Sequence, residues 1–400
     1  MRQAPKWRSW FPTGREIRFF IQSTIAKLFP TLALRYNFVL KQMDWDQVDQ
    51  TEALSWADYS EVSLSEELHD FLQDFGDNEK QRTGGKTPKS AHLFARVYEF
   101  KNVYVLGHTG SNLLKDERCQ VEALSKNTMR FQTMKDRHIK GYCLNLLGVP
   151  KGHRHYYFFH CLFMPSFLQF LDGFSSRYEK LTILVREDLS GFQKTFYKQI
   201  ESWKPNVRFE IINTTERVLC DELVYLRGRG SSKFRSPYSQ NAMELVAGVY
   251  RAAYELSALQ KPFRKIYVCR QDAKIRQVLN EQKLIDLLGS YGFEVVTPGN
   301  LSHKEQVKVF SEAKIVVGVH GAGLTNLMFT QPEGHVIEIF PADYIQGAYT
   351  WMSTLKEHQY TPIVGSKSLG HQNFSLTEEN LSELESILSG HTEGEAAQVA

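Results

Sequence analysis

The amino-acid sequence predicts an α/β protein with two Rossmann-like domains, each built on a parallel sheet. From residue 91 to about residue 341, short β-branched runs alternate with amphipathic stretches, which is the pattern of successive βαβ units. The chain has 400 residues, more than one ordinary hydrophobic core accommodates. Apolar residues make up 42% of it, which is ample for burial and argues against general disorder.

Charge and cysteine usage exclude several classes of protein. The 48 basic and 45 acidic residues leave a net charge of +3, which is too balanced to make nucleic acid the main partner. The five cysteines are scattered, without a C-x-x-C pair and without the spacing of metal ligands. They are Cys119, Cys143, Cys161, Cys220 and Cys269. Such a set is typical of buried free thiols in a reducing compartment.

Residues 1–90 are expected to form a helical or irregular extension before the first domain. Within it, residues 15–41 carry apolar side chains at near-helical spacing, with arginine and lysine between them. This segment either packs on its own domain or makes a peripheral contact with an anionic membrane surface. The sequence shows no secretory signal pattern and no run of about 18 apolar residues, so the predicted location is the cytoplasm.

The N-terminal domain is predicted over residues 91–240. Its expected elements are a hairpin or meander of strands at 92–100 and 102–106, a helix at 167–174, a strand at 181–185, a helix at 191–203 and a strand at 207–212. Residues 227–235 follow as a basic loop. This loop either clamps a phosphate or an acidic sugar, or it is a solvated linker.

The C-terminal domain is predicted over residues 241–374. Its expected elements are helices at 240–260, 278–291 and 304–312, and strands at 265–269, 293–297, 315–319 and 336–340. Residues 375–400 are expected to form a last helix and a frayed tail. The helix has a capping pattern over residues 375–378, Ser-Leu-Thr-Glu.

The stretch 313–341 is the centre of this second domain. A buried strand stops at His320, and a turn with Gly321 and Gly323 leads into a short helix. Two glycines allow positive φ and leave no side chain between the backbone and a ligand. The N–H groups and the positive partial charge of a helix N-terminus suit a phosphate. The alternative is a glycine turn that serves tight packing alone.

Residues 264–341 resemble the C-terminal part of glycosyltransferase family 61, of the bacterial type. The matching pieces are IYVCRQDA at 266–273, Arg276, VLNE at 278–281, GFEVV at 292–296, VGVHGAGLTN at 317–326 and VIEI at 336–339. Their order and spacing fit over about eighty residues. The element HGAGLTN is the most specific of them.

This resemblance implies a GT-B fold, in which two Rossmann-like domains face each other. It also implies an inverting transfer of sugar from a nucleotide-sugar to a hydroxyl of a glycan or a lipid-linked acceptor, in the synthesis of a surface polysaccharide. The nucleotide-sugar is a substrate, and no separate cofactor is expected. No metal is expected either, because no D-x-D stands at a predicted strand end.

The predicted donor site gathers at the carboxyl ends of the strands, where open α/β sheets bind ligands. It comprises Arg270, Arg276, His320, Gly321, Ala322, Gly323, Thr325, Asn326 and Glu338. The arginines pair with phosphate, Thr325 and Asn326 bind phosphate or sugar, and Glu338 accepts hydrogen bonds from ribose hydroxyls. The backbone of the glycine turn stabilises the leaving diphosphate. The plain alternatives are surface ion pairs for the arginines and a solvated strand end for Glu338.

An inverting transfer needs a base that takes the proton of the acceptor hydroxyl. The family often carries Asn-Tyr-Tyr-His-Trp-x-x-Asp-x-x-Pro in its N-terminal domain. When this chain is aligned on Pro165, Phe158 and Leu162 stand where that pattern has His and Asp. The candidates for the base are therefore the nearby His160 and Asp188. The alternative for His160 is a core histidine.

Three classes of function are compatible with these residues. The first is the glycosyltransferase. The second is a catalytically inactive relative that binds nucleotide or glycan as a scaffold, which Leu162 in place of the carboxylate favours. The third is another GT-B-like enzyme, such as a nucleotide-sugar epimerase, which would need no acceptor.

Overall fold

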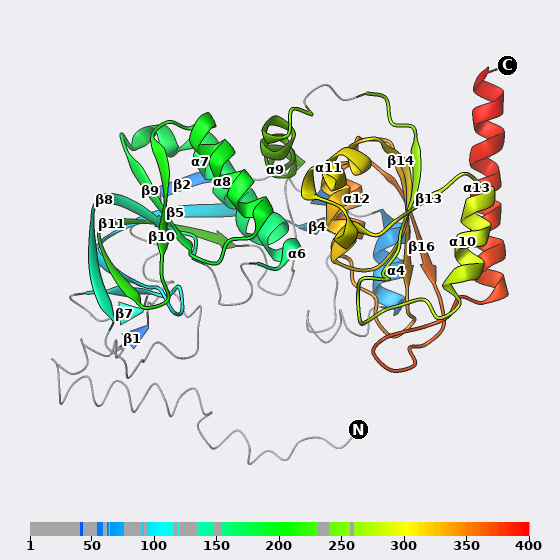
Figure 1. The fold of residues 1–400 in the computed structure, drawn as a ribbon, viewed down its shortest axis with the longest axis horizontal. Helices are drawn as coiled ribbons and strands as arrows, with labels where there is room; N and C mark the ends of the chain where they lie inside the picture. The colour runs from blue at the N-terminus through cyan, green and yellow to red at the C-terminus, as the bar shows by residue number, and fades with distance from the viewer. Residues whose placement is uncertain are drawn as a thin grey trace, which may run out of the picture. The chain divides into compact units, whose positions relative to one another are not determined.

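A computed structural model supplies the fold. It describes residues 41–42, 54–58, 62–63, 65–75, 90–91, 94–115, 119–120, 134–147, 154–229, 240–256 and 260–399. The chain divides into two compact units (Figure 1). The N-terminal unit comprises residues 1–57, 95–159 and 170–227, and the C-terminal unit comprises residues 58–94, 160–169 and 228–400. Two segments that precede the predicted second domain in sequence thus group with the C-terminal unit.

The N-terminal unit contains a nine-stranded mixed sheet. Its strands are β1 (Lys41–Gln42), β2 (Leu54–Asp58), β5 (Phe94–Leu106), β6 (Asn112–Leu114), β7 (Cys119–Gln120), β8 (Lys135–Asn145), β9 (Leu181–Arg186), β10 (Val207–Ile212) and β11 (Glu216–Arg229). The order is β1-β7-β6-β5-β11-β8-β9-β10, and β2 pairs with β5. The strands β11, β8, β9 and β10 run parallel, whereas β5, β6 and β7 form an antiparallel meander. The predicted parallel sheet therefore makes up only part of this half, and the hairpin or meander predicted from strands 92–100 and 102–106 is wrong, because these residues form the single strand β5.

Helices of the N-terminal half follow the predicted pattern. They are α6 (Tyr156–Phe158), the π turn η2 (Phe159–Phe163), α7 (Met164–Gly173), the 3-10 turn η3 (Ser175–Arg177) and α8 (Gly191–Trp203). The bounds of α8 agree with the prediction, and a capping box of Ser190 and Gln193 fixes its start. Its buried face includes Phe196 and Ile200.

The C-terminal unit is built on a five-stranded sheet in which every pair of neighbours is parallel. Its strands are β12 (Arg264–Val268), β13 (Glu294–Val296), β14 (Ala313–Val319), β15 (His335–Phe340) and β16 (Gln359–Val364). The helices are α4 (Glu66–Phe75), α9 (Gln240–Ala253), α10 (Glu281–Ser290), α11 (His303–Ser311), the 3-10 helix η5 (Ala322–Phe329), α12 (Ala348–Leu355) and α13 (Glu378–Val399). Short pieces complete it, namely the pair β3 (Val62–Ser63) and β4 (Ser90–Ala91) and the 3-10 turn η4 (Pro298–Asn300). The predicted α/β class with parallel strands is confirmed.

The order of the strands in this sheet locates a switch point. The order β13-β12-β14-β15-β16 means that the chain moves outward from β12 to β13 and then crosses back to β14. In open α/β sheets, the loops after the two central strands diverge at such a point and leave room for a ligand. The loops that leave β12 and β14 are therefore the place to examine.

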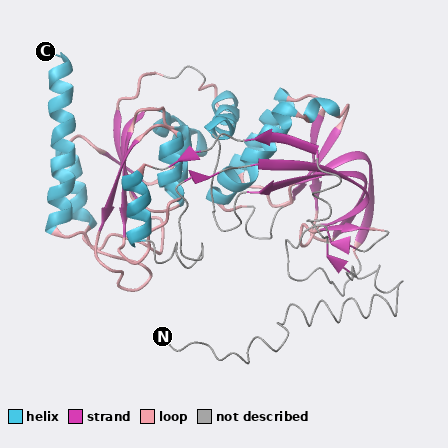
Figure 2. Ribbon diagram, turned by 180° about the vertical axis from the view of Figure 1, so that it is seen from behind, coloured by secondary structure: helices cyan, strands magenta, loops and turns pink. Residues whose placement is uncertain are grey.

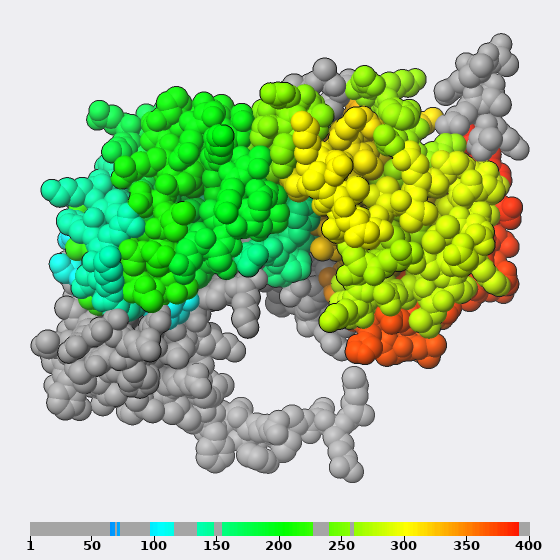
Figure 3. Space-filling model, in the orientation of Figure 1, coloured from blue at the N-terminus to red at the C-terminus, as the bar shows by residue number. Residues whose placement is uncertain are grey.

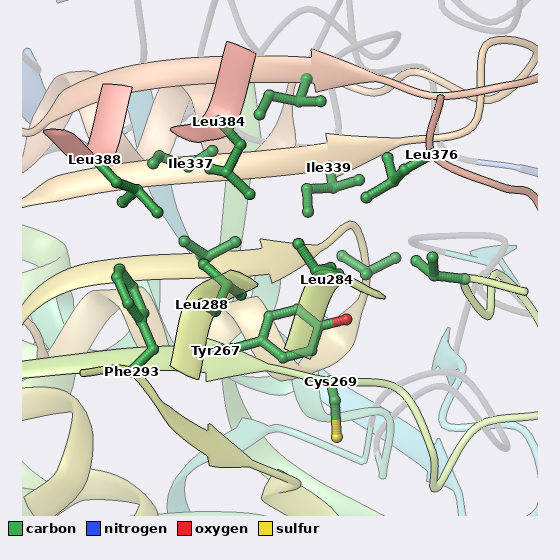
Figure 4. Close-up of a cluster of buried hydrophobic side chains, with 14 of the residues drawn as sticks. Tyr267, Cys269, Leu284, Leu288, Phe293, Ile337, Ile339, Leu376, Leu384 and Leu388 are labelled. Carbon is green, nitrogen blue, oxygen red and sulfur yellow. The ribbon is translucent and has the colours of Figure 1, made fainter. Parts of the chain in front are cut away.

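Helices cover both faces of the sheet (Figures 1 and 2). On one face, α10 and α13 pack on a core that Figure 4 shows from within. It includes Tyr267, Cys269, Leu284, Leu288, Phe293, Ile337, Ile339, Leu376, Leu384 and Leu388. The other face carries η5, which contacts both α11 and α12. In Figure 3, the lime to yellow atoms, from about residue 260 to residue 315, form much of the surface of the C-terminal unit that faces the viewer.

Several features of the C-terminal unit differ from the sequence-based expectation. Neither α12 nor β16 was predicted, and α4 belongs to this unit, where Leu72 packs on Phe340 and Trp351. The cap of α13 is Thr377, whose hydroxyl accepts from the Asn380 N–H at 3.2 Å, rather than Ser375. The expected frayed tail continues as helix to Val399.

Some predictions concern residues that the structure does not describe, and others can be compared with the described residues. Residues 15–40 of the amphipathic segment 15–41 and most of the basic loop 227–235 are not among the described residues. Four of the cysteines, Cys143, Cys161, Cys220 and Cys269, are buried and free, as predicted for structural thiols. Among the helices of the described ranges, none is both long enough and apolar enough to cross a bilayer.

Candidate functional site

The glycine turn after β14 contains three consecutive backbone N–H groups that take no part in the hydrogen bonds of the helix that follows. The first hydrogen bond of η5 runs from the Leu324 N–H to the Gly321 carbonyl at 2.9 Å. The N–H groups of Gly321, Ala322 and Gly323 therefore precede the hydrogen bonds of the helix itself. The predicted positive φ is wrong, because Gly321 has φ 169° and ψ 176°, which is extended backbone.

Glycine at 321 is needed because the side chain of Arg270 lies against it. A Cβ at this position would stand 1.5 Å from one terminal nitrogen of the Arg270 guanidinium and 2.6 Å from its central carbon. Gly323 is close to Val268 and Pro298, at 3.2 and 3.3 Å from such a Cβ. The absence of side chains at the two glycines thus lets neighbouring side chains lie close to the backbone of the turn. At Gly321 the neighbouring side chain is that of Arg270.

Arg270 enters this position from the loop after β12, on the other side of the switch point. Its Nε donates to the Ile275 carbonyl at 3.1 Å, which fixes the direction of the side chain. Burial lowers the pKa of Arg270 to about 10, and the charge of Arg276 lowers it further in the same direction. The group therefore stays charged at neutral pH, at a cost that a bound anion would relieve.

Arg276 is held in a strained conformation beside Arg270. Its φ is 58°, a left-handed value that non-glycine residues adopt rarely, and its N–H donates to the His371 carbonyl at 3.0 Å. The guanidinium lies over the ring of Tyr344, 4.9 Å from the centroid. Its Nε is buried without a hydrogen-bond partner. A buried charged donor left unsatisfied is costly unless a ligand completes it.

No carboxylate forms an ion pair with either of these two arginines within the described part of the chain. In contrast, Arg264, the first residue of β12, pairs with both Glu294 and Glu312. The plain interpretation of the two arginines as surface ion pairs is therefore wrong. The two guanidinium groups and the N–H groups of the turn belong to the loops that follow β12 and β14. Groups of these kinds are suited to binding a diphosphate.

His320, Glu338 and Tyr360 form a hydrogen-bonded chain across three strands. The Nδ1 of His320 is 2.5 Å from Oε1 of Glu338, and the hydroxyl of Tyr360 donates to Oε2 at 2.6 Å. Glu338 has no exposed surface, and burial raises its pKa to about 8. The predicted solvated strand end and the predicted contact with ribose both need an open carboxylate. Glu338 instead lies inside β15, with both oxygens engaged.

Thr325 and Asn326 make hydrogen bonds within the protein that stabilise the turn. Both are fully buried in η5. The amide of Asn326 donates to the Gly323 carbonyl and to Gln306 Oε1, each at 3.1 Å, and the Thr325 hydroxyl is 3.2 Å from that of Tyr349. These contacts hold the turn in place, and direct contact of either residue with a donor stays a prediction.

The two candidates for the base have very different surroundings. His160 is completely buried, with its Nε2 2.9 Å from the hydroxyl of Tyr250 and its ring stacked with His303. That environment is that of a core histidine and offers an acceptor no access. Asp188 follows β9 in the N-terminal unit, where its side chain is exposed and lies 4.0 Å from Arg154.

Three tyrosines of the site were not found from the sequence. Tyr344 and Tyr349 contact the His320 ring at centroid distances of 5.8 and 5.4 Å, and Tyr360 binds Glu338. All three lie within residues 341–374, a region for which no element was predicted. An aromatic residue at every few positions of this segment was the available signal.

The fold and this edge define a Rossmann-like α/β protein with a glycine turn and two arginines at its switch point. The model of the family described as Glycosyltransferase 61 matches residues 68–337, well over half of the chain. The chain therefore belongs to glycosyltransferase family 61. The family resemblance seen in residues 264–341 is confirmed, and the match extends into the N-terminal unit.

Curated relatives match shorter stretches. A β-1,2-xylosyltransferase, RCN11, of Oryza sativa subsp. japonica is 32% identical over 91 residues, which cover 23% of this chain and 16% of the relative. An EGF domain-specific O-linked N-acetylglucosamine transferase of Drosophila melanogaster is 31% identical over 105 residues (24% and 20%). The rice α-1,3-arabinosyltransferase XAT2 is 30% identical over 125 residues (29% and 20%). The chain thus spans a fifth or less of the length of these relatives.

Proposed function

We propose that this protein transfers a sugar, with inversion, from a nucleotide-sugar to a hydroxyl of a glycan or a lipid-linked acceptor, by a metal-independent mechanism of the GT-B type. One observation carries the proposal. Arg270 lies against the glycine turn at the switch point, and the charge of Arg276 acts on it, while neither guanidinium forms an ion pair among the described residues. The names of the relatives, transferases of xylose, arabinose and N-acetylglucosamine, support a sugar as the group transferred.

The chemistry of a nucleotide-sugar explains why such a site would catalyse transfer. When the bond from the sugar to the diphosphate breaks, negative charge grows on the phosphate oxygen that leaves. Donors that already point at this oxygen stabilise the transition state without reorganising. The guanidiniums of Arg270 and Arg276 and the N–H groups of residues 321–323 are such donors. They supply positive charge where a metal ion would otherwise be needed.

Asp188 is the residue that we propose as the base. It is exposed, whereas His160 is enclosed by Tyr250 and His303. Asp188→Asn should lower the rate of transfer by about 100-fold or more, in the range of general-base contributions, and should leave nucleotide affinity unchanged in calorimetry. A matched Asp172→Asn variant, on an exposed carboxylate in α7, should keep full activity. Wild-type rates in Asp188→Asn would remove Asp188 from the mechanism.

A panel of nucleoside diphosphates and nucleotide-sugars tests the function as a whole. Ligand at about 100 times its Kd adds about 2.7 kcal/mol to stability, which is a rise of several degrees in Tm for a protein of this size. We expect one nucleobase to give this rise, and the matching labelled nucleotide-sugar to yield product only when an acceptor is added. Product without acceptor would indicate an epimerase, and binding without any turnover an inactive scaffold. No shift with any nucleotide would refute the proposal.

A further inference from the structure

One peptide unit, between Ile275 and Arg276, fixes both arginines of the loop after β12. Its carbonyl accepts the hydrogen bond from Nε of Arg270 at 3.1 Å, and its N–H donates to the His371 carbonyl at 3.0 Å. His371 lies in the loop after β16, which makes further hydrogen bonds with residues 277–279. The backbone at Arg276 is therefore held on both sides, which maintains its left-handed φ of 58°.

Tyr344 is fixed at the other end of the Arg276 side chain. It lies in the turn after β15, where its N–H donates to the Pro341 carbonyl at 3.0 Å. The carboxylate of the preceding residue, Asp343, accepts from the backbone N–H of Ser368 at 3.0 Å and from its hydroxyl at 2.5 Å. The turn with Tyr344 and the backbone of Arg276 are therefore attached to the same loop, the one after β16. The guanidinium joins them, 4.9 Å from the centroid of the Tyr344 ring.

The contacts of the two arginines form a closed circuit. Arg276 lies over the ring of Tyr344, which is 5.8 Å from the ring of His320. His320 immediately precedes Gly321, and the guanidinium of Arg270 lies against Gly321. Arg270 in turn donates to the peptide unit that begins Arg276. Both guanidiniums therefore border the same part of the sheet edge as the glycine turn, and Tyr344 lies between Arg276 and the residue that begins the turn.

The ring of Tyr344 stabilises the charge of Arg276 without occupying its hydrogen-bond donors. The negative face of an aromatic ring attracts a guanidinium, more strongly when the pair is removed from water. A carboxylate in this place would accept hydrogen bonds from the guanidinium and compete with a phosphate for them. Within the described ranges no carboxylate forms an ion pair with Arg276, and its Nε is buried without a partner. The charge of Arg276 lowers the pKa of Arg270, so the two cations repel each other until an anion binds.

We propose that Tyr344 is a positioning residue of the diphosphate site, which holds the guanidinium of Arg276 by the face of its ring and leaves the N–H donors to a phosphate. This inference rests on the proposed function, because it takes the diphosphate to bind at the glycine turn. A guanidinium already held in place loses less rotamer freedom when the anion binds, so the contact raises affinity. The Tyr344 hydroxyl makes no hydrogen bond within the described part of the chain, so the ring alone should carry the effect.

Substitutions at Tyr344 are tested by calorimetric titration with inorganic pyrophosphate, which probes the anion site without a nucleoside. Tyr344→Phe keeps the ring and should bind as the wild type does. Tyr344→Leu removes the ring and should bind about tenfold more weakly, the loss expected for a contact of this kind. Phe263→Leu is the matched control, because Arg264 lies over the Phe263 ring at 5.3 Å in the same kind of contact at the start of β12. Its affinity should not change.

A series of fluorinated rings separates the attraction of the charge from mere packing. Phenylalanine with no, one, two or three fluorine atoms is placed at position 344 by stop-codon suppression. Each fluorine weakens the negative face of the ring, whereas the shape of the side chain changes little. The Kd of pyrophosphate should rise with each fluorine, to about tenfold overall, and so should that of the nucleoside diphosphate identified by thermal shift. In an Arg276→Leu background the series should be flat, although the ring still contacts His320.

The outcomes distinguish this inference from the proposed function. If Kd does not change along the fluorine series, or rises equally in the Arg276→Leu background, the positioning role of Tyr344 fails, even where nucleotide binds and transfer occurs. If the series behaves as expected with pyrophosphate but no nucleotide binds, the proposed function fails and the role of Tyr344 in binding an anion holds. If the wild type binds neither pyrophosphate nor any nucleoside diphosphate, both fail. If Tyr344→Leu does not fold, the fluorine series, which keeps the ring, still decides the question.

Discussion

Arg270→Ala is expected to weaken binding of nucleoside diphosphate by about 100-fold or more. The guanidinium lies against the glycine turn and has no carboxylate partner among the described residues, so its charge is available to a phosphate. Two charge-assisted hydrogen bonds, at about 1.5–3 kcal/mol each, correspond to losses of that size. Calorimetric titration with the diphosphate identified by thermal shift is the measurement, and the rate of transfer should fall in parallel.

Arg264→Ala is the matched control for this loss. Arg264 lies at the start of β12, where it pairs with Glu294 and Glu312. Its removal should lower Tm slightly, because partly exposed ion pairs contribute about 1 kcal/mol or less, and should leave nucleotide affinity unchanged. If Arg270→Ala binds the diphosphate as the wild type does, Arg270 is not a donor ligand.

Gly321→Ala is expected to have an effect of similar size, through Arg270 itself. The added methyl group would stand 1.5 Å from a guanidinium nitrogen, so the arginine must leave its place. Diphosphate affinity should therefore drop about 100-fold without any change in charge. Gly289→Ala, on α10 with no atom within 4 Å of the new Cβ, should bind normally and be slightly more stable.

The double variant Gly321→Ala with Arg270→Ala tests whether the methyl group acts by displacing the arginine. If it does, the double variant should bind no more weakly than Arg270→Ala alone, because the two changes remove the same interaction. Fully additive losses would show that Gly321 contributes independently, for example by direct approach of its backbone to the phosphate.

The sequence predicted the central strands β14 and β15 because nearly all of their residues are buried. Apolar runs such as Val316–Val319 are continuous, as expected for parallel strands covered on both faces. The missed strand β16 contains Pro362, which argues against a central strand but is tolerated here because β16 is at the edge of the sheet. The missed helix α12 is buried on nearly all sides, so it lacks the polar face that reveals a helix.

Errors in the site have a common physical origin. Glu338 was predicted to accept hydrogen bonds from ribose, with a solvated strand end as the alternative, because a buried carboxylate is costly without partners. Its partners, His320 and Tyr360, come from neighbouring strands, and pairing between strands cannot be seen in one sequence. The two strands predicted at 92–100 and 102–106 are one continuous strand, β5, within which Asn102 adopts φ 54°. Local patterns thus located the turn and its arginines, but not what surrounds them.

A crystal structure of the protein with its nucleoside diphosphate bound is the most direct test of the central claim. The account predicts phosphate oxygens within hydrogen-bond distance of the guanidiniums of Arg270 and Arg276 and of the N–H groups of residues 321–323. A diphosphate bound elsewhere on the chain, with both guanidiniums untouched, would contradict it.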